Sequence, residues 1–201
     1  MSDRFLAVHA LRIKGLASAE DLTAISGTDL GPVLDQLVAE DLVKLRTGRI
    51  GGYTLTKEGR AAHPGLLAET VTDVERAGVD ETYTAFLPVN ARFKEICTRW
   101  QCKDGGQESN DHSDADYDAK VIDDLASTHD AVVAALGPAA AVAPRFGRYA
   151  DRFASALERV RGGEQAAFAR PMSHSYHDVW MELHEDLLLT LGRERDAADG
   201  H

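Results

Sequence analysis

The chain has 201 residues, 44% of them hydrophobic, so it is long enough for one large or two small domains with a buried core. Its formal net charge of −11 disfavours non-specific adhesion to nucleic acid or membrane, so any DNA contact must be local. No apolar run approaches a membrane span and no signal peptide opens the chain, and we expect a cytoplasmic protein. Cys97 and Cys102 lie at neither a zinc nor a redox spacing, which indicates free thiols.

Residues 1–63 begin with a pattern of three short helices. Apolar residues fall on one face over residues 4–14, and a second short helix fits residues 19–25. Thr28 or Asp29 is expected to cap the third helix. The buried stripe expected for this third helix consists of Leu30, Val33, Leu34, Leu37 and Val38.

Two short runs with β-strand character follow the third helix. They cover residues 43–46 and 52–56, and the glycine-rich connection between them predicts a β-hairpin. Thr56 is then placed to cap a helix that begins at Lys57. Three helices, a hairpin and a further helix follow one another in a winged helix, where the hairpin is the wing. We therefore predict a winged helix-turn-helix domain over residues 1–63.

This first part of the chain resembles the winged helix-turn-helix of the MarR-like regulators. The residues that carry the resemblance are Asp41-Leu42-Val43 after the third helix and the run Tyr53–Arg60 after the wing. The resemblance implies a DNA-binding regulator that places its third helix in the major groove. Winged helices also serve as protein-contact modules, so DNA binding and protein docking both stay open.

The third helix lacks the chemistry that usually supplies DNA affinity. It carries no Lys or Arg, and phosphates would repel Asp29 and Asp35, whereas Thr28 and Gln36 can read base edges. Residues 1–63 contain eight basic and eight acidic side chains. Any DNA affinity must therefore come largely from the wing and the first helix. The DNA contacts that we expect are Thr28, Gln36, Arg46, Arg49, Arg12 and Lys14.

The rest of the chain has the pattern of helices joined by short connections. We predict a linker helix over residues 64–79, an antiparallel helical bundle over residues 80–193 and a flexible tail over residues 194–201. Pro64 is expected to start the linker helix and Gly78 to end it. The predicted fold class is therefore mainly α, a winged helix followed by a bundle for ligand binding or dimerisation.

The bundle is expected to contain four main helical stretches. They cover about residues 80–102, 117–136, 139–160 and 173–193. Pro88 falls inside the first stretch, where it predicts a kink or a restart.

Two helical faces of the bundle combine polar side chains with large aromatic ones. This mixture is typical of a ligand pocket. A buried Lys94 would need an anionic partner, either a ligand carboxylate or a protein acid. In the alternative interpretation, the polar groups form a solvated rim or satisfy carbonyls and carboxylates of the bundle. The expected pocket residues are Asn90, Lys94, Trp100, Gln101, His177, Trp180 and His184.

Histidines in the last helix raise the question of a metal site. His174 and His177 stand at i and i+3, so they can share an ion with a third ligand such as His112. His184 lies about 10 Å along the axis from His177, too far for the same ion. The alternative is that the rings satisfy polar groups within the bundle.

Four arginines form a stripe over residues 145–159. They are able to receive a phosphate, a coenzyme A tail or DNA, but in so acidic a chain we favour pairing with acidic loops. The stripe consists of Arg145, Arg148, Arg152 and Arg159.

A second resemblance covers nearly the whole chain. Residues 86–90, 97–101 and 176–180 resemble parts of an actinobacterial helical module that follows a similar winged helix. This module can be appended to proteins resembling pyruvate phosphate dikinase. The resemblance implies an accessory or regulatory module and supplies no catalytic residues.

The sequence therefore predicts a homodimeric, ligand-responsive transcriptional regulator. Its partners would be DNA and a small effector, an organic acid or an acyl thioester, bound in the helical bundle. No phosphate loop, nucleophile elbow or carboxylate pair identifies an enzyme, and no cofactor is indicated. The alternatives are an accessory module that docks on a metabolic enzyme and a metal-binding sensor.

Overall fold

The computed structural model describes residues 1–48 and 51–194, and its fold is mainly α. The chain divides into two compact units, Met1–Ala77 and Gly78–His201, each with a hydrophobic core of its own. Residues 195–201, most of the expected tail, lie outside the described residues. Among the helices that are described, none has both the length and the apolar character needed to cross a membrane.

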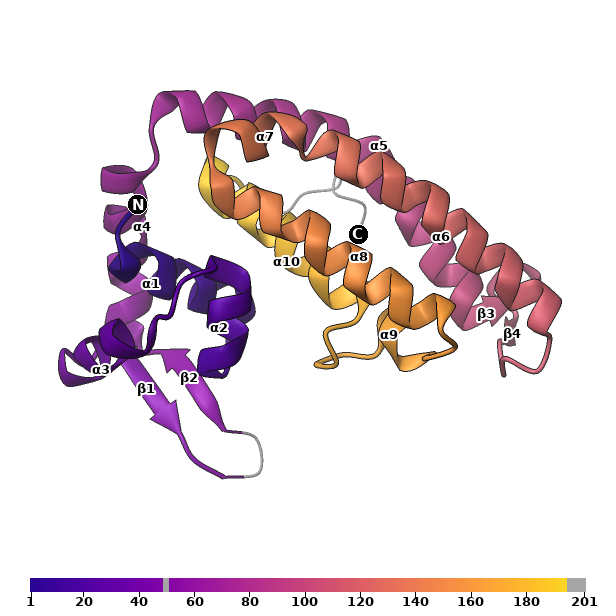
Figure 1. Cartoon of the computed structure of the whole chain (residues 1–201), viewed down its shortest axis with the longest axis horizontal. Coiled ribbons are helices and arrows are strands. Elements are labelled where there is room, and N and C mark those ends of the chain that lie inside the picture. The colour runs from indigo at the N-terminus through magenta and orange to yellow at the C-terminus, as the bar shows by residue number, and fades with distance from the viewer. Residues whose placement is uncertain (49–50, 195–201) are drawn as a thin grey trace. The chain divides into compact units, whose positions relative to one another are not determined.

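The first unit consists of three helices, a hairpin and a fourth helix, in a winged-helix-like arrangement (Figure 1). The strands pair antiparallel, with Val43 opposite Leu55 and Arg46 opposite Gly52. The sequence predicted this order of elements, and the structure confirms it. The elements are α1 (Asp3–Lys14), α2 (Ala19–Ser26), α3 (Gly31–Ala39), β1 (Val43–Arg46), β2 (Gly52–Leu55) and α4 (Lys57–Thr70).

Short polar contacts fix the ends of these elements. Ser18 and Asp21 form a capping box at the start of α2, and Gly27 ends that helix at a φ of 75°. Thr56 accepts a hydrogen bond from the Gly59 amide and donates one to the Asp41 carbonyl, 2.7 Å away. The side chain of Thr56 thus ties the start of α4 to the turn that precedes the hairpin.

The core of the first unit confirms most of the expected buried stripe of α3. Leu30, Leu34 and Leu37 are fully buried. Val33 is half-buried against this core, and Val38, at the edge of that face in the last turn, is 39% exposed. The caps differ as well: Leu30 occupies the N-cap position, and Asp29 accepts a hydrogen bond from the Gly31 amide at 2.9 Å.

A buried pair of histidines joins α1 to α4. Nδ1 of His9 lies 2.8 Å from Nε2 of His63, and both side chains are buried. The ring of Phe5 stacks on His9, with centroids 4.9 Å apart. One of the two facing nitrogens must carry a hydrogen and the other must not, so both rings cannot be cations while this bond persists.

The predicted linker helix over residues 64–79 is wrong. Instead, α4 continues through Pro64 to Thr70, Val71 is extended, and α5 (Asp73–Gln101) begins after Thr72. The Thr72 amide donates to Glu75 Oε2 at 2.8 Å, and the Glu75 amide donates to the Thr72 hydroxyl at 3.2 Å. This reciprocal pair is a capping box, which starts a new helix at this point of the chain.

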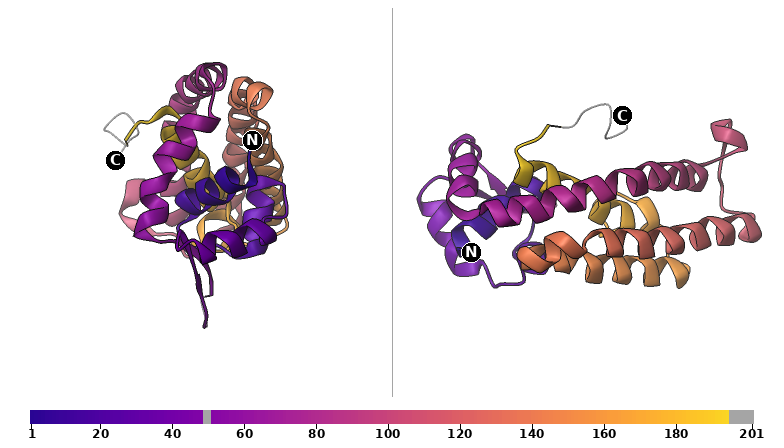
Figure 2. Two further views of the ribbon diagram at one scale, coloured as in Figure 1. Left: turned by 90° about the vertical axis from the view of Figure 1, so that its left-hand side faces the viewer. Right: turned by 90° about the horizontal axis from the view of Figure 1, so that it is seen from above.

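The second unit is a set of helices in which α8 packs against α6 and α10 (Figure 2). A hairpin of two antiparallel two-residue strands, with a 3-10 turn, η1, between them, connects α5 to α6. The elements after α5 are β3 (Cys102–Lys103), η1 (Asp104–Gly106), β4 (Glu108–Ser109), α6 (Ala115–Ala135), α7 (Gly137–Val142), η2 (Pro144–Phe146), α8 (Gly147–Arg161), α9 (Ala166–Ala169) and α10 (Tyr176–Leu191).

Helix α5 is longer and more continuous than expected. It neither restarts at Pro88 nor stops at Gly78. Buried side chains on both sides of the exposed Pro88, among them Phe86 and Phe93, hold the helix against the core. Gly78 serves close packing, because a β-carbon there would lie 2.7 Å from Cγ2 of Val142 in α7.

Aromatic rings from three helices form the centre of the second core. Trp180 of α10 stacks on Phe93 of α5, with ring centroids 4.0 Å apart, and Phe86 lies 5.2 Å from the same indole. Phe153 of α8 meets Trp180 edge-on at 5.7 Å. This cluster joins α5, α8 and α10 into one packed body.

Candidate functional site

The exposed face of α3 is the first component of a candidate nucleic-acid interface. Leu34 and Leu37 anchor the helix in the core, which fixes the direction in which its other side chains point. Gln36, a predicted DNA contact, is exposed on the outer side. Thr28, also predicted, is half-buried in the turn before α3, where its backbone exchanges hydrogen bonds with the Ser26 hydroxyl.

The hairpin is the second component, and it carries exposed cations. Lys44 and Arg46 of β1 are exposed, and within the described chain neither side chain has a polar partner. Gly52 opposite Arg46 lies against the α1–α2 connection, where a β-carbon would come within 2.7 Å of the Ala17 carbonyl oxygen. Only glycine fits this close approach. The hairpin is thereby attached to the helices at its base, while Arg46 stays in solvent.

The remaining predicted DNA contacts have different surroundings. Arg12 and Lys14 occupy the last turn of α1 and are half-buried. Arg49 lies outside the described residues. Lys57 and Arg60, in the first turn of α4, are exposed cations that the sequence had not assigned to the interface. The signal for them is their position directly after the second strand of the wing.

Acidic groups near α3 are partly neutralised. Glu40, the C-cap of α3, forms an ion pair of 2.6 Å with Arg4. Asp29 is engaged by the Gly31 amide. Asp35 is exposed, and among the described residues its carboxylate has no partner. Within the part of the chain that the structure describes, α3 therefore carries the unpaired acid Asp35, and β1 carries the unpaired cations Lys44 and Arg46.

The residues predicted to line a ligand pocket do not come together on one surface. Asn90, Trp180 and His184 are buried in the aromatic core, where Trp180 Nε1 donates to Asn90 Oδ1 at 2.8 Å. Asn90 lies at the edge of the buried face of α5. Lys94 and Gln101 are rotated slightly further around the helix axis, and their side chains are exposed. Asn90 is therefore part of the core, whereas Lys94 and Gln101 face solvent.

The two other predicted pocket residues lie apart from that hydrogen bond. Trp100 is buried at the end of α5 and stacks on Phe168, with ring centroids 4.2 Å apart and planes within 2° of parallel. His177 is half-buried and lies 6.1 Å from the ring of Phe93. Both residues contribute to packing of the helical unit.

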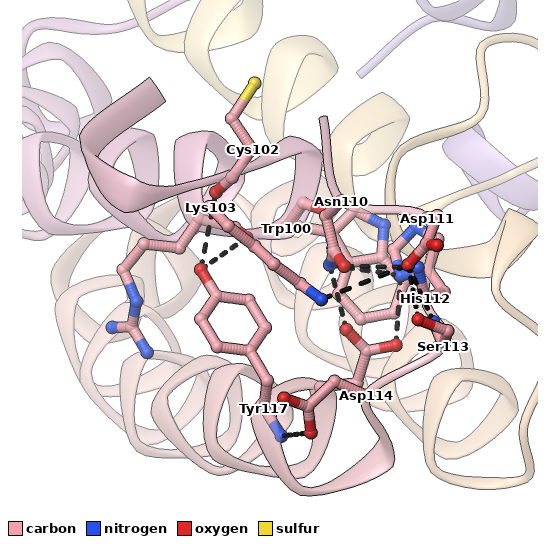
Figure 3. A network of polar contacts seen from close by, with 11 residues as sticks. Trp100, Cys102, Lys103, Asn110, Asp111, His112, Ser113, Asp114 and Tyr117 are labelled. Atoms are coloured by element: carbon pink, nitrogen blue, oxygen red, sulfur yellow. Dashed lines mark hydrogen bonds and ion pairs between the residues drawn. The ribbon is translucent and has the colours of Figure 1, made fainter. Parts of the chain in front are cut away.

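His112, a predicted metal ligand, belongs to a polar network at the α5–α6 connection (Figure 3). Its Nδ1 lies 3.0 Å from Oδ2 of Asp118, whose other oxygen accepts a hydrogen bond from Asn110 at 2.9 Å. The second hydrogen of the Asn110 amide group goes to the Trp100 carbonyl. Since a carboxylate only accepts, His112 Nδ1 carries the hydrogen. The network closes the connection over the Trp100 ring, 4.4 Å from the imidazole.

The predicted metal ligands do not assemble. Within residues 1–48 and 51–194, no group of three or more His, Cys, Asp or Glu side chains is placed to hold an ion. His112 is held by Asp118, whereas the backbone carbonyl of His174 accepts a hydrogen bond from Arg159 at 3.1 Å. The i, i+3 spacing of His174 and His177 fails because α10 begins only at Tyr176, which leaves His174 in the preceding turn at a φ of 53°.

A buried network of charges joins α10 to the start of α8. Asp186 accepts hydrogen bonds from Arg145 Nε at 3.4 Å and from the Tyr149 hydroxyl at 3.1 Å. The second Arg145 contact is Nη2 with the Thr190 hydroxyl, at 2.7 Å. Burial, followed by the charge of Asp186, raises the pKa of Tyr149 well above its usual range, so its hydroxyl stays protonated and donates.

Two other arginines of the predicted stripe also form ion pairs, and the remaining one, Arg148, is exposed. Arg152 pairs with Glu182, and Arg159 pairs with Glu164. The interpretation that these arginines pair with acids is confirmed, although two of the partners lie on a helix. The sequence signal for this network is a pair of matching helical stripes. Arg145, Tyr149 and Arg152 supply hydrogen-bond donors, and Glu182, Asp186 and Thr190 at similar spacing supply acceptors.

The environment of Cys97 predicts a thiol of low reactivity. Burial raises the pKa of Cys97 to about 12, so almost no thiolate forms there at pH 8. Iodoacetamide at pH 8 should therefore label Cys97 only after denaturant is added. Peptide mass spectrometry measures the modification of Cys97, and equal labelling of this thiol in the folded and the denatured chain would contradict the prediction.

Two histidines of the helical unit predict a loss of stability in mild acid. Burial lowers the pKa of His177, partly opposed by Asp178. Burial is also the main cause of the lowered pKa of His129, with Asp130 opposing it and Arg161 adding to it. In the unfolded chain both imidazoles have a pKa of about 6.5. As the pH falls through that value, the unfolded state takes up more protons, so the free energy of unfolding decreases.

Urea denaturation at pH 7.5 and pH 5.5 measures this effect. The wild type should lose stability at the lower pH, and His129→Gln/His177→Gln should lose less over the same interval. An unchanged pH dependence in the double variant would mean that other groups are responsible.

Comparison with protein-family models, with curated proteins and with solved structures finds no match for this chain.

Proposed function

We propose that the chain is a DNA-binding transcriptional regulator of the MarR-like kind, which contacts duplex DNA through α3 and the β1–β2 hairpin. The observation that carries the proposal is the exposed polar face of α3, followed in the chain by a hairpin with exposed cations, Lys44 and Arg46, that have no partner among the described residues. In a winged helix, the third helix enters the major groove and the hairpin approaches the backbone.

The charges favour separate roles for α3 and the hairpin in DNA binding. Phosphate contacts supply most of the affinity for DNA, and here the cations are on the hairpin and at the start of α4. The outer face of α3 has groups that read bases but none that attract phosphates. DNA affinity is therefore modest per protomer, and a homodimer raises it because both interfaces contribute binding free energy.

Salt-dependent DNA binding is the test. A fluorescein-labelled duplex of mixed sequence is titrated with the full chain, and anisotropy is recorded from low to physiological salt. We expect binding that weakens steeply with salt, with a slope of about −0.9 per phosphate contacted. Absence of binding at the lowest salt concentration would overturn the proposal.

The proposal includes a small effector, an organic acid or an acyl thioester, for the helical unit. Its support is the sequence pattern of polar side chains among large aromatic ones on the helices of that unit. Thermal unfolding of the chain with and without acetyl coenzyme A tests this part. A rise in the midpoint that saturates with concentration is expected, and no change for this ligand and a panel of small carboxylates would remove the effector.

Protein docking is the second candidate, and two exposed apolar side chains favour it. Val38 of α3 is 39% exposed and Leu45 of β1 is 54% exposed. An apolar side chain at each of these positions is available for contact with another protein. Under this alternative, Leu45→Ser abolishes partner binding and the chain shows no affinity for DNA at any salt concentration.

A further inference from the structure

The outer face of α3 has a defined composition. Four exposed residues stand at i, i+3, i+4 and i+7, which makes them one continuous stripe opposite the buried leucines. The stripe consists of Pro32, Asp35, Gln36 and Ala39. Since the core fixes the rotation of α3, these are the side chains that a groove-inserted helix would present to base edges.

The hydrogen-bonding chemistry of this stripe is unusual for a DNA-reading helix. Guanine presents two acceptors in the major groove and is read by Arg or Lys, and α3 has neither. The Asp35 carboxylate only accepts, and it is free to do so among the described residues. The donors available to it in the groove are the amino groups of cytosine and adenine. Asp29 does not compete, because it is engaged by the Gly31 amide.

Gln36 supplies the complementary group. Its amide both donates and accepts, which matches the N6 and N7 edge of adenine in a bidentate contact. Asp35 and Gln36 are adjacent in α3, so they address neighbouring base pairs. Pro32 and Ala39 at the two ends of the stripe are apolar and suit thymine methyl groups.

Resting on the proposed function, we propose that Asp35 reads cytosine through its N4 amino group and that Gln36 reads a neighbouring adenine. Each half-site of the operator therefore contains a required C·G pair beside an A·T pair. The carboxylate lowers affinity for every sequence by repelling phosphates, and it restores affinity only where cytosine donates to it. Lys44 and Arg46 supply the attraction that α3 does not.

The experiment begins with selection of binding sites from a randomised duplex library by the full chain. The selected site is then changed one base pair at a time, and the dissociation constants are measured for the wild type, Asp35→Ala, Asp35→Asn and the control Glu69→Ala. Glu69 is an exposed acid near the end of α4, so its removal changes the net charge equally and leaves α3 intact.

We expect one C·G pair whose replacement weakens wild-type binding about tenfold. Asp35→Ala removes the preference at this pair alone and raises affinity for unrelated DNA. Asp35→Asn shifts the preference toward adenine, because an amide matches the adenine edge. Glu69→Ala keeps the wild-type preference. Because Asp35 is exposed, its variants are expected to melt within a few degrees of the wild type, which a thermal melt verifies.

Two results would overturn the inference, and they are distinguishable. If Asp35→Ala retains full discrimination at every position while binding stays salt-dependent, the base assignment is wrong and the proposed function stands. If the chain binds no duplex at low salt, the proposed function fails and the base assignment falls with it.

Discussion

Asp186→Ala is expected to lower the free energy of unfolding of the helical unit by about 3–5 kcal/mol, the range for removing one partner of a buried ion pair. Asp186 is 1% exposed and holds Arg145, which is itself only 7% exposed. Its loss removes the carboxylate that balances the buried guanidinium, which leaves Arg145 with the Thr190 hydroxyl and Tyr149 with the Glu182 carbonyl at 3.4 Å. Within the described chain, Nη1 of Arg145 already lacks a hydrogen-bond partner.

Urea denaturation followed by tryptophan fluorescence measures this change, because Trp180 lies in the same core. The matched control is Asp80→Ala, which breaks an exposed ion pair of 2.7 Å with Arg193 in the same unit. Exposed pairs contribute about 0–1 kcal/mol, so the control should remain close to the wild type. Equal effects of the two substitutions would show that the buried network does not stabilise the bundle.

The double variant Lys44→Ala/Arg46→Ala is expected to weaken DNA binding by about 10- to 100-fold at low salt and to reduce the salt slope by about 2. Both cations are exposed on β1 and have no ion-pair partner among residues 1–48 and 51–194, so they are free to meet phosphates. Anisotropy titrations across a range of salt concentrations provide both quantities.

The control for this prediction removes two cations elsewhere. Lys120→Ala/Arg148→Ala changes the net charge equally, at exposed positions of α6 and α8. If overall charge governed binding, both double variants would weaken it alike. If the hairpin contacts DNA, only the hairpin variant loses DNA affinity and part of the salt dependence of binding.

The fold of the first unit was predictable because local signals agree with one another. The apolar stripe of α3, the glycine-rich connection of the hairpin and the Thr56 cap each indicate the same arrangement. The error at residues 64–79 has a local cause as well. Pro64 was interpreted as a helix start, whereas the Thr72–Glu75 capping box, present in the sequence, marks the actual start of α5.

The helical unit was predictable in its elements but not in its polar contacts. Hydrophobic spacing identifies which face of a helix is buried. Whether a polar side chain at the edge of that face is buried or exposed depends on its neighbours from other helices. Asn90 is buried because Trp180 donates to it, and Lys94, one turn later, is exposed. Arg145 and Asp186 lie 41 residues apart in the chain, and the packing of α8 on α10 brings their two elements together.

The most direct test of the account is a map of where DNA contacts the chain. Amide chemical shifts of the ¹⁵N-labelled full-length protein are recorded during titration with a short duplex at low salt. If α3 and the hairpin contact DNA, the largest changes fall in α3 and in the β1–β2 hairpin, with smaller ones at the start of α4. Changes confined to the helical unit, or no changes at any duplex concentration, would contradict it.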